Sequence, residues 1–306
     1  MNKTYKKQKF TAATTCAGCP IGVVARTVLN ATDDPIVVTN ATGCMEVTST
    51  IYPNTSWKVP YIHSVFGNAG ATASGIEAAV KSLSKQGKVD EKVKVIAFAG
   101  DGGTYDIGFQ ALSGALERGH DFLYVCYDNG AYMNTGNQRS GATPLGASTQ
   151  TTPFGKEAFG KQTRRKDIMT IVAGHHVPYA ATANIGFLED FKAKVKKALA
   201  IKGPKFILVF SPCVALWKFP PAKTFEVAKL GTETNFWPLY EIENGHYKFS
   251  YEPKKRKPIE EFYGTQGRFK HIFKRDDKEA LLQKIQKEID DDFARIKATV
   301  ESHQKV

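Results

Sequence analysis

The apolar positions of the chain fall into two alternating patterns over its first two thirds. Short runs of β-branched and aromatic residues have the composition of buried strands, and between them apolar residues recur at helical spacing. The predicted strands are 36–39, 92–99, 122–127, 179–182 and 206–210. The predicted helices are 21–29, 68–85, 107–116 and 187–201. This alternation predicts an α/β fold with a doubly wound, mostly parallel sheet.

Two segments show neither pattern. Residues 52–63 are rich in Pro, Asn, Thr and aromatic residues, and we expect an irregular loop there. Residues 134–160 carry many Gly, Thr, Ser and Pro residues and are too long for an ordinary connector, so we expect an ordered active-site loop. The helix at 68–85 has a high share of Gly and Ala, which predicts close packing against backbone or against a partner.

The character of the chain changes after Cys213. Residues 214–275 combine prolines, aromatics and lysines with little periodicity, which favours an irregular arm with a short hairpin around Asn244-Gly245. Residues 276–302 are strongly charged and amphipathic, which predicts a closing helix.

The length of 306 residues suffices for one large domain or two ordinary ones. We expect an α/β domain at 1–213 and, at 214–306, an arm and amphipathic helix that pack on partner subunits. No apolar run approaches the ~20 residues of a membrane helix. Residues 1–10 are rich in lysine and lack an apolar core, so we expect a solvated tail and no signal peptide. A cytoplasmic protein without membrane contact is the expectation.

The formal net charge of +12 raises the question of acidic partners. The basic runs at 192–197 and 254–257 lack the aromatic interleaving of a nucleic-acid module, so nucleic acid is not an expected partner. Steering of an acidic partner protein is one remaining explanation. A solvated surface balanced by acidic partner subunits is the other, and we favour it.

Candidate chemistry begins at the ends of two predicted strands. The acidic, glycine-rich turn Gly100-Asp101-Gly102-Gly103-Thr104 follows the strand at 92–99, and Asp128-Asn129 follows the strand at 122–127. Glycines allow backbone N–H groups to approach a phosphate closely, and oxygen ligands from Asp101 and Asn129 suit Mg²⁺. A single Gly-Asp-Gly turn is often only structural. Two matched strand ends instead favour the diphosphate–magnesium half of a thiamine diphosphate site, because ligands bind where parallel strands end.

The five cysteines are Cys16, Cys19, Cys44, Cys126 and Cys213. Their odd number, without a secretory signal, argues against a disulfide framework. Cys126 lies inside a predicted strand and is expected to be a core residue. The other four provide soft ligands with one close pair, which suits a [4Fe–4S] cluster or a structural zinc. A zinc ribbon usually has two close pairs, so iron–sulfur is favoured.

Several motifs in combination resemble one known family. They are Cys16-Ala17-Gly18-Cys19, Ala41-Thr42-Gly43-Cys44-Met45-Glu46-Val47, Gly100-Asp101-Gly102-Gly103-Thr104, Tyr132-Met133-Asn134-Thr135-Gly136, Gln138-Arg139-Ser140-Gly141-Ala142-Thr143-Pro144, and the late stretches 258–262 and 266–271. They resemble the β subunits of pyruvate:ferredoxin oxidoreductases, which belong to the 2-oxoacid:ferredoxin oxidoreductase family. The resemblance covers residues 16–275, and the four-subunit archaeal-type enzymes are the most similar.

The resemblance implies a fold of the thiamine-diphosphate-binding type and assigns roles to matching positions. The implied [4Fe–4S] ligands are Cys16, Cys19, Cys44 and Cys213. The implied magnesium ligands are Asp101, Asn129 and the carbonyl of Ala131. The implied cofactor-binding residues are Cys44, Gly100, Asp101, Gly102, Gly103, Thr104, Asn129, Ala131 and Asn134. Asn134 is also the implied catalytic residue, near the carboxylate and the reacting carbon of the substrate.

The implied activity is oxidative decarboxylation of pyruvate to acetyl-CoA and CO₂. Coenzyme A is the co-substrate, and electrons pass through the cluster to ferredoxin. Activity would require α-, γ- and δ-type partner subunits, since the glutamate that activates the cofactor's aminopyrimidine comes from a partner in this family. Departures at Pro20-Ile21, Gly130 and Asn137 leave the substrate open.

The alternatives are enzymes on the same scaffold that act on 2-oxoisovalerate or 2-oxoglutarate, or on oxalate without coenzyme A. A simple decarboxylase that releases aldehyde is less favoured, because it would not need the cysteines. A non-catalytic, zinc-binding scaffold subunit is the alternative from another class.

Overall fold

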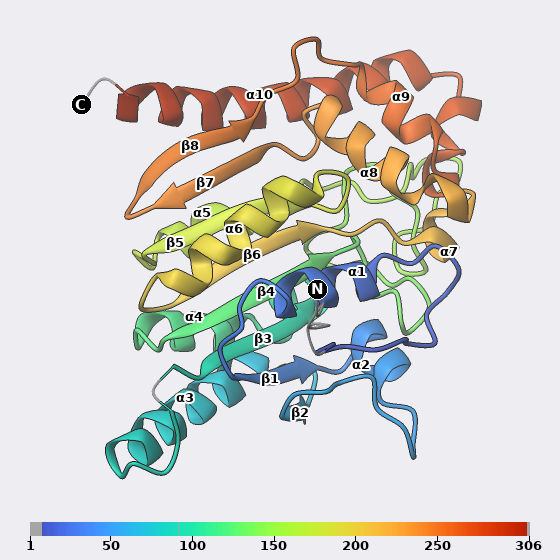
Figure 1. The fold of residues 1–306 in the computed structure, drawn as a ribbon. Helices are drawn as coiled ribbons and strands as arrows, with labels where there is room; N and C mark the ends of the chain where they lie inside the picture. The colour runs from blue at the N-terminus through green and yellow to red at the C-terminus, as the bar shows by residue number, and fades with distance from the viewer. Residues whose placement is uncertain (1–7, 91, 305–306) are drawn as a thin grey trace, which may run out of the picture.

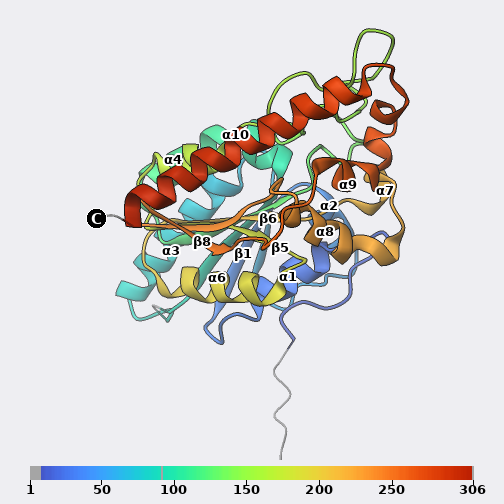
Figure 2. The same ribbon diagram turned by 90° about the horizontal axis from the view of Figure 1, so that it is seen from above.

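A mixed sheet crosses the whole molecule, and helices cover both of its faces (Figures 1 and 2). The computed structural model describes residues 8–90 and 92–304. In this part of the chain the sheet has eight strands in the order β2-β1-β3-β4-β6-β5-β7-β8. The strands are β1 Ile36–Ala41, β2 Tyr61–Ser64, β3 Lys94–Gly100, β4 Phe122–Asp128, β5 Tyr179–Asn184, β6 Lys205–Phe210, β7 Leu239–Glu243 and β8 His246–Tyr251.

The first six strands are parallel, as the alternation of strands and helices predicted. The α-helices are α1 Ile21–Leu29, α2 Cys44–Ser49, α3 Ala69–Lys85, α4 Phe109–Glu117, α5 Ile168–Ala173, α6 Leu188–Ala200, α7 Val214–Trp217, α8 Thr224–Glu233, α9 Ile259–Gly264 and α10 Lys278–Gln304. Helices α1 and α6 lie on one face, and α3, α4 and α10 lie on the other (Figure 2). The predicted doubly wound α/β architecture is therefore confirmed.

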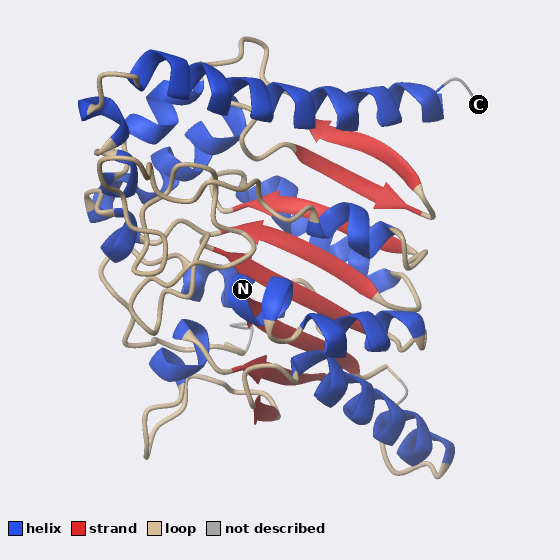
Figure 3. Cartoon of the chain, turned by 180° about the vertical axis from the view of Figure 1, so that it is seen from behind, coloured by secondary structure: helices blue, strands red, loops and turns tan. Residues whose placement is uncertain are grey.

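The carboxyl ends of the parallel strands all lie at one edge of the sheet, where the loops gather (Figure 3). β1 leads into Gly43 and Cys44, β3 into Asp101, β4 into Asn129 and β6 into Cys213. The candidate residues therefore come from distant parts of the sequence but share one edge.

Two element predictions were wrong. Residues 52–63 were expected to be irregular, but β2 begins at Tyr61 and pairs with β1. It is a four-residue edge strand with two exposed side chains, so it lacks the apolar run of a buried strand. Residues 214–275 were expected to lack periodicity, but they contain α8. Its buried face includes Thr224, Gly231 and Thr232, so small and polar residues conceal the helical repeat.

The hairpin predicted around Asn244-Gly245 is confirmed as β7 and β8. Both turn residues have positive φ, +50° and +84°, as a tight hairpin turn requires. β7 pairs antiparallel with β5, so the hairpin extends the central sheet. The expected division at residue 213 falls between β6 and α7, and the sheet continues beyond it.

The long connection between β4 and α5 is ordered around a buried lysine. Lys161 is 2% exposed, and its ammonium donates hydrogen bonds to the carbonyl oxygens of Thr143 at 2.5 Å and Arg164 at 3.1 Å. Burial lowers the pKa of this amine to about 8. The Lys161 ammonium thus helps to order this loop, because it provides hydrogen bonds to backbone carbonyl oxygens of residues that lie outside the helices and strands.

The small-residue helix α3 packs closely on α4, where Gly70 lies against the backbone of Ala111 and Leu112. The close contact is with backbone, which was one of the two predicted options. The lysine-rich start falls largely on residues 1–7, outside the described residues. None of the described helices combines the length and the apolar character needed to cross a membrane.

Candidate cofactor site

A pocket of about 80 Å³ opens at the carboxyl edge of the sheet, among the turns that follow β1, β2, β3 and β4. Gly100 pairs with Tyr127, so the ends of β3 and β4 are neighbours, as predicted. The predicted site residues that line the pocket are Cys44, Gly100, Asp101, Gly102, Gly103, Asn129, Ala131 and Asn134. The structure thus brings most of the predicted cofactor residues to one cavity.

Thr104 does not line this pocket. Its side chain is fully buried, and its hydroxyl donates a hydrogen bond to the carbonyl oxygen of Gly100 at 2.8 Å. Thr104 therefore stabilises the turn after β3 without facing the pocket. The turn itself continues as a π-helix, η1 Gly102–Asp106, a rare geometry that is frequent at functional sites.

The aromatic ring of Tyr132 covers the start of this π-helix. A Cβ atom at Gly102 would lie 2.3 Å from the Tyr132 ring, so only glycine fits there. The Tyr132 hydroxyl donates to the Asp106 carboxylate at 3.2 Å, which ties the loop after β4 to the turn after β3. The two sides of the pocket are thereby held in one arrangement.

Three oxygen-bearing groups meet at the floor of the pocket. One terminal atom of the Asn129 amide lies 3.0 Å from Asp101 Oδ1 and 2.9 Å from the Ala131 carbonyl oxygen. With the amide nitrogen at this position, both contacts are hydrogen bonds. With the amide oxygen there, its distance from each of the other two oxygens is close to the ~2.9 Å that separates neighbouring ligands around Mg²⁺ at about 2.0–2.1 Å. Asp101, Asn129 and Ala131 therefore fit a magnesium ion.

The Asp101 carboxylate is 1% exposed and accepts hydrogen bonds from Ser140 Oγ and from the backbone N–H of Asn129. Burial raises its pKa well above the usual range, and the charge of Asp128 raises it further. A bound divalent cation has the opposite effect, because it stabilises the charged form. A carboxylate buried in this way is therefore suited to a cation partner.

The Asp128 carboxylate has a protein counter-ion instead. Burial raises its pKa, but Arg165 Nη2 lies 2.7 Å from Oδ2 and lowers it, and the Tyr105 hydroxyl donates to the same oxygen at 2.8 Å. The guanidinium of Arg165 also lies over the rings of Trp237, at 4.7 Å, and Phe236, at 5.5 Å. This ion pair fixes the residue that directly precedes Asn129. Nothing in the local sequence around Arg165 indicates the role.

Trp217 is a second residue that the sequence did not assign to the site. Its indole N–H donates a hydrogen bond to the backbone carbonyl oxygen of Asn129 at 2.8 Å, and this contact restrains the backbone of Asn129. The guanidinium of Arg268 lies 3.7 Å over the Trp217 ring. Burial lowers the pKa of Arg268 to about 9.

Both Gly130 and Asn137, where the chain departs from the family pattern, have a left-handed backbone with φ of +75°. Asparagine tolerates this conformation far better than an aliphatic residue does. The Gly130 N–H donates to Asp128 Oδ1 at 3.0 Å. These residues therefore suit the loop that the structure has here.

The four candidate cluster cysteines share one neighbourhood at this edge. Cys16 is exposed, and Cys19, Cys44 and Cys213 are partly buried against the core. Burial raises the pKa of the Cys44 thiol to about 12, and the charges of Cys213, Cys19 and Cys16 contribute to the rise. Cys126, by contrast, is fully buried inside β4, as predicted. Among the described residues, no three His, Cys, Asp or Glu side chains form a set that fits a metal ion.

The Cys-x-x-Cys loop is held against the segment that follows Cys213. Thr224 Oγ1 donates to the carbonyl oxygen of Gly18 at 2.8 Å. Gly18 has φ of +75°, and a Cβ atom there would lie 2.5 Å from the Pro221 carbonyl oxygen. Glycine at this position thus permits the contact between two segments about 200 residues apart.

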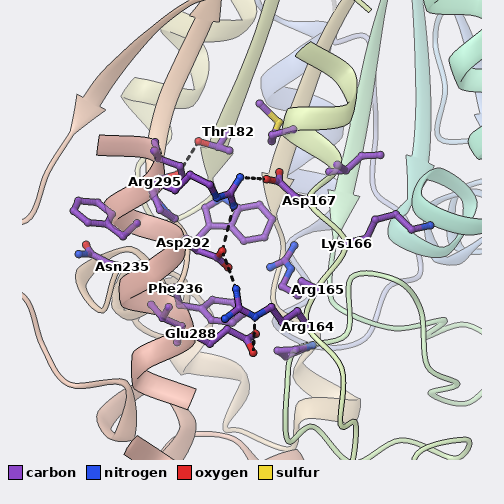
Figure 4. A pocket seen from close by; sticks show the side chains of 18 of the residues that line it. Arg164, Arg165, Lys166, Asp167, Thr182, Asn235, Phe236, Glu288, Asp292 and Arg295 are labelled. Carbon is purple, nitrogen blue, oxygen red and sulfur yellow. Dashed lines mark hydrogen bonds and ion pairs between the residues drawn. The ribbon is translucent and has the colours of Figure 1, made fainter. Parts of the chain in front are cut away.

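A larger cavity of about 370 Å³ lies between α10 and the sheet, and none of the predicted site residues lines it. Figure 4 shows a chain of ion pairs along it, in which Arg295 contacts Asp167 and Asp292, and Arg164 contacts Asp292 and Glu288. The wall of this cavity includes Arg165 but no cysteine. It also lacks Asp101, Asn129 and Ala131, the three residues whose oxygens meet at the smaller pocket and which we call the oxygen cradle. The predicted site residues therefore gather at the smaller pocket and not at this cavity.

Comparison with known proteins defines the class first. Residues 41–209 match the family described as "Thiamine pyrophosphate enzyme, C-terminal TPP binding domain". The match spans more than half of the chain and includes β2, β3 and β4, which end at the pocket, and the turn that follows β1. The fold and the site are thus those of a thiamine-pyrophosphate-binding enzyme domain.

Curated relatives define the family. The pyruvate synthase subunit PorB of Methanocaldococcus jannaschii is 55% identical over 278 residues, covering 90% of this chain and 92% of that protein. PorB of Thermotoga maritima is 50% identical, covering 92% and 88%. The ketoisovalerate oxidoreductase subunit VorB of Pyrococcus abyssi is 44% identical, covering 97% and 94%. The chain belongs to this family of thiamine-pyrophosphate-dependent 2-oxoacid oxidoreductase subunits.

A solved structure supports the fold. The 2-oxoglutarate:ferredoxin oxidoreductase from Magnetococcus marinus, with 2-oxoglutarate, coenzyme A and succinyl-CoA bound, aligns with a TM-score of 0.56 and 22% identity. The alignment covers 69% of this chain and 70% of that chain.

The Asp128–Arg165 pair leads to a testable difference between adjacent arginines. We expect Arg165→Met to lower the free energy of unfolding by about 3–5 kcal/mol, because it leaves a buried carboxylate without its partner. Arg164→Met is the matched control, since Arg164 is 57% exposed and its ion pairs span 3.5–3.9 Å. It should cost less than about 1 kcal/mol. Urea unfolding of both variants measures the difference, and equal losses would contradict the assignment.

Proposed function

We propose that this chain is the β subunit of a pyruvate:ferredoxin oxidoreductase. In this role it holds thiamine diphosphate through Mg²⁺ and carries a proximal [4Fe–4S] cluster. The complex converts pyruvate and coenzyme A to acetyl-CoA and CO₂ and passes the electrons to ferredoxin. The observation that carries the proposal is the convergence of the oxygen cradle and the four cysteines on one edge of the sheet.

The residues at the pocket have separate roles in this proposal. Asp101, Asn129 and the Ala131 carbonyl hold Mg²⁺, and the backbone of Gly102 and Gly103 faces the diphosphate. Bound thiamine diphosphate supplies the electron sink that decarboxylation of a 2-oxo acid requires. Asn134 lines the same pocket, and we assign its amide to binding of the substrate carboxylate.

The cysteines fit a cluster for a physical reason. Burial and mutual repulsion raise the pKa of Cys19, Cys44 and Cys213 and so disfavour their thiolates. Iron bound to the sulfur atoms would stabilise the thiolates and offset this cost. A cubane cluster distributes its four ligands over four iron atoms, so its thiolates stand further apart than the ligands of a single ion. Cys44 lines the cofactor pocket and starts α2, so it would join the cluster to the cofactor site.

The chain provides one half of the cofactor site, and partner subunits of the α, γ and δ types complete the enzyme. Near Cys44 and Phe66, which line the pocket, apolar side chains on α2 and β2 and just after each of them are exposed: Val47, Ile51, Ile62 and Val65. Such a patch next to an incomplete site suits a protein partner. We place the assembled enzyme in the cytoplasm, where ferredoxin and coenzyme A are present.

A second candidate substrate is 2-oxoisovalerate. The VorB relative spans nearly the whole chain at 44% identity, so the family includes a ketoisovalerate oxidoreductase subunit. The pyruvate assignment rests on five PorB relatives that are 50–55% identical, although two other PorB relatives, at 46%, are about as similar as VorB. The other 2-oxo acids and oxalate are tested alongside.

The central experiment is expression of the chain alone and with its genomic neighbours under anaerobic conditions. Reduction of a viologen dye, dependent on coenzyme A, is measured with pyruvate, 2-oxoisovalerate, 2-oxoglutarate and oxalate. We expect turnover by the complex with pyruvate as the preferred substrate, and none by the chain alone. Full turnover by the isolated chain would refute the half-site proposal, and preference for another acid would reassign the substrate.

The cradle is tested by Asp101→Ala in the complex. We expect this change to abolish binding of thiamine diphosphate with Mg²⁺ while iron content stays constant, because it removes a charged ligand and touches no cysteine. Asp90→Ala is the control, because Asp90 is an exposed carboxylate just before the other end of β3. Isothermal titration calorimetry measures both. Unchanged affinity in Asp101→Ala would show that the turn is not the diphosphate site.

The cluster is tested by a pair of cysteine variants. We expect about four iron per chain in the anaerobically purified protein and in Cys126→Ala, because Cys126 is a core residue. Cys44→Ala should lose most of this iron and the associated brown absorbance. Iron, sulfide and zinc analysis provides the measurement. Stoichiometric zinc without iron would favour the scaffold alternative instead.

A further inference from the structure

The cavity between α10 and the sheet has no role in the proposed function, yet its size suits a small molecule. Its volume of about 370 Å³ lies within the roughly 300–1,000 Å³ that ligand pockets occupy. Much of its wall is apolar and comes from α5, α10 and the segment before β7: Met169, Phe236, Trp237, Ile285, Ile289 and Ile296. A wall of this kind with a few polar groups is typical of pockets that bind organic molecules.

One of the polar groups is the guanidinium of Arg165, which the fold uses on one side only. Among the described residues, its hydrogen bonds go to the Tyr105 hydroxyl at 3.0 Å and to Asp128 Oδ2 at 2.7 Å, and both come from Nη2. The rings of Phe236 and Trp237 hold the group in place. The protons on Nε and Nη1 are thus available to an anion in the cavity.

The neighbouring Arg164 also lines the cavity and is only loosely paired. Its guanidinium lies 3.5–3.9 Å from the carboxylates of Glu288, Asp291 and Asp292, and Figure 4 shows the contacts with Glu288 and Asp292. These distances exceed the ~2.7–2.9 Å of a charge-assisted hydrogen bond. Arg164 can therefore bind a ligand carboxylate without losing a short contact. The same three acids would repel an anion that carries no positive group.

Asn235 provides an unused acceptor in the cavity wall. The residue is 7% exposed, and its side-chain oxygen Oδ1 has no hydrogen-bond partner among the described residues. Its backbone is left-handed, with φ of +58°, which glycine would adopt at least as readily. The backbone conformation therefore does not explain the buried amide. A donor that arrives with a bound molecule would satisfy it, since buried polar atoms are normally paired.

We propose that this cavity binds a free α-amino acid with an apolar side chain. The carboxylate of the amino acid pairs with Arg165 and Arg164. Its ammonium donates to Asn235 Oδ1 and is attracted by Glu288 and Asp292, and its side chain packs on the apolar wall. The inference depends on neither the iron–sulfur cluster nor thiamine diphosphate, so it can fail or succeed apart from the proposed function.

The probes are L-leucine and L-phenylalanine, titrated calorimetrically into the full chain and into its complex. Isocaproate is leucine without the ammonium, and isoamylamine is leucine without the carboxylate. We expect saturable binding of one amino acid per chain, and binding of both analogues at least about tenfold weaker, because each lacks one charge-assisted hydrogen-bonding group. Equal affinity for leucine and its analogues would overturn the inference, as would no saturable binding. Binding to the chain but not to the complex would also overturn it, since a partner would then fill the cavity.

Two variants test the binding mode. Asn235→Gly suits the left-handed backbone and removes the amide, so it should weaken leucine binding at least about tenfold and leave isocaproate binding unchanged. Asn244→Gly is the matched control, because Asn244 has φ of +50° but is exposed in the turn between β7 and β8. Arg164→Met should weaken leucine binding in a folded protein, because its ion pairs are long. Unchanged leucine affinity in Asn235→Gly or in Arg164→Met would overturn the assigned site.

Discussion

Two carboxylates, Asp101 and Asp128, are buried side by side at the ends of adjacent strands, and the structure around them has to offset the cost of burying their charges. Asp101 and Asp128 are each 1% exposed; burial raises the pKa of both carboxyls, and the charge of Asp128 raises that of Asp101 further. The structure resolves the conflict differently at the two positions. Asp128 receives Arg165 and the Tyr105 hydroxyl, whereas Asp101 faces the Asn129 amide and the Ala131 carbonyl. Asp128 thus has a cationic partner in Arg165, whereas Asp101 accepts hydrogen bonds from Ser140 Oγ and from the backbone N–H of Asn129.

This division links the pocket to the rest of the fold. Arg165 reaches Asp128 from the segment that precedes α5, and its guanidinium rests on Trp237 and Phe236 next to β7. Trp217 supports the Asn129 carbonyl from the other direction. Residues beyond Cys213 thus stabilise a cradle that consists of residues before it. The C-terminal segment contributes to the site as well as to the surface.

The same logic applies to the cysteines. The sheet brings the ends of β1 and β6 to one edge, and the hydrogen bond from Thr224 to Gly18 holds the Cys-x-x-Cys loop there. Free thiols in this arrangement repel one another when they ionise. Under the proposed function, iron bound to the sulfur atoms would relieve this repulsion, as a bound Mg²⁺ would offset the burial of the Asp101 carboxylate.

The sequence by itself determined the elements and the chemistry of their ends. Apolar runs identified five of the six parallel strands, because a strand buried on both faces must be continuously apolar. Glycine, aspartate and cysteine motifs identified the residues that the pocket collects. The edge strand β2 and helix α8 escaped detection, because their side chains are not constrained by a uniformly apolar environment.

Only the tertiary structure decided which distant residues meet. Arg165 lies 37 positions from Asp128, and no local pattern connects them. The physical reason is that local sequence fixes how each strand ends, whereas the order of strands in the sheet fixes which ends are neighbours, and that order depends on packing across the whole chain.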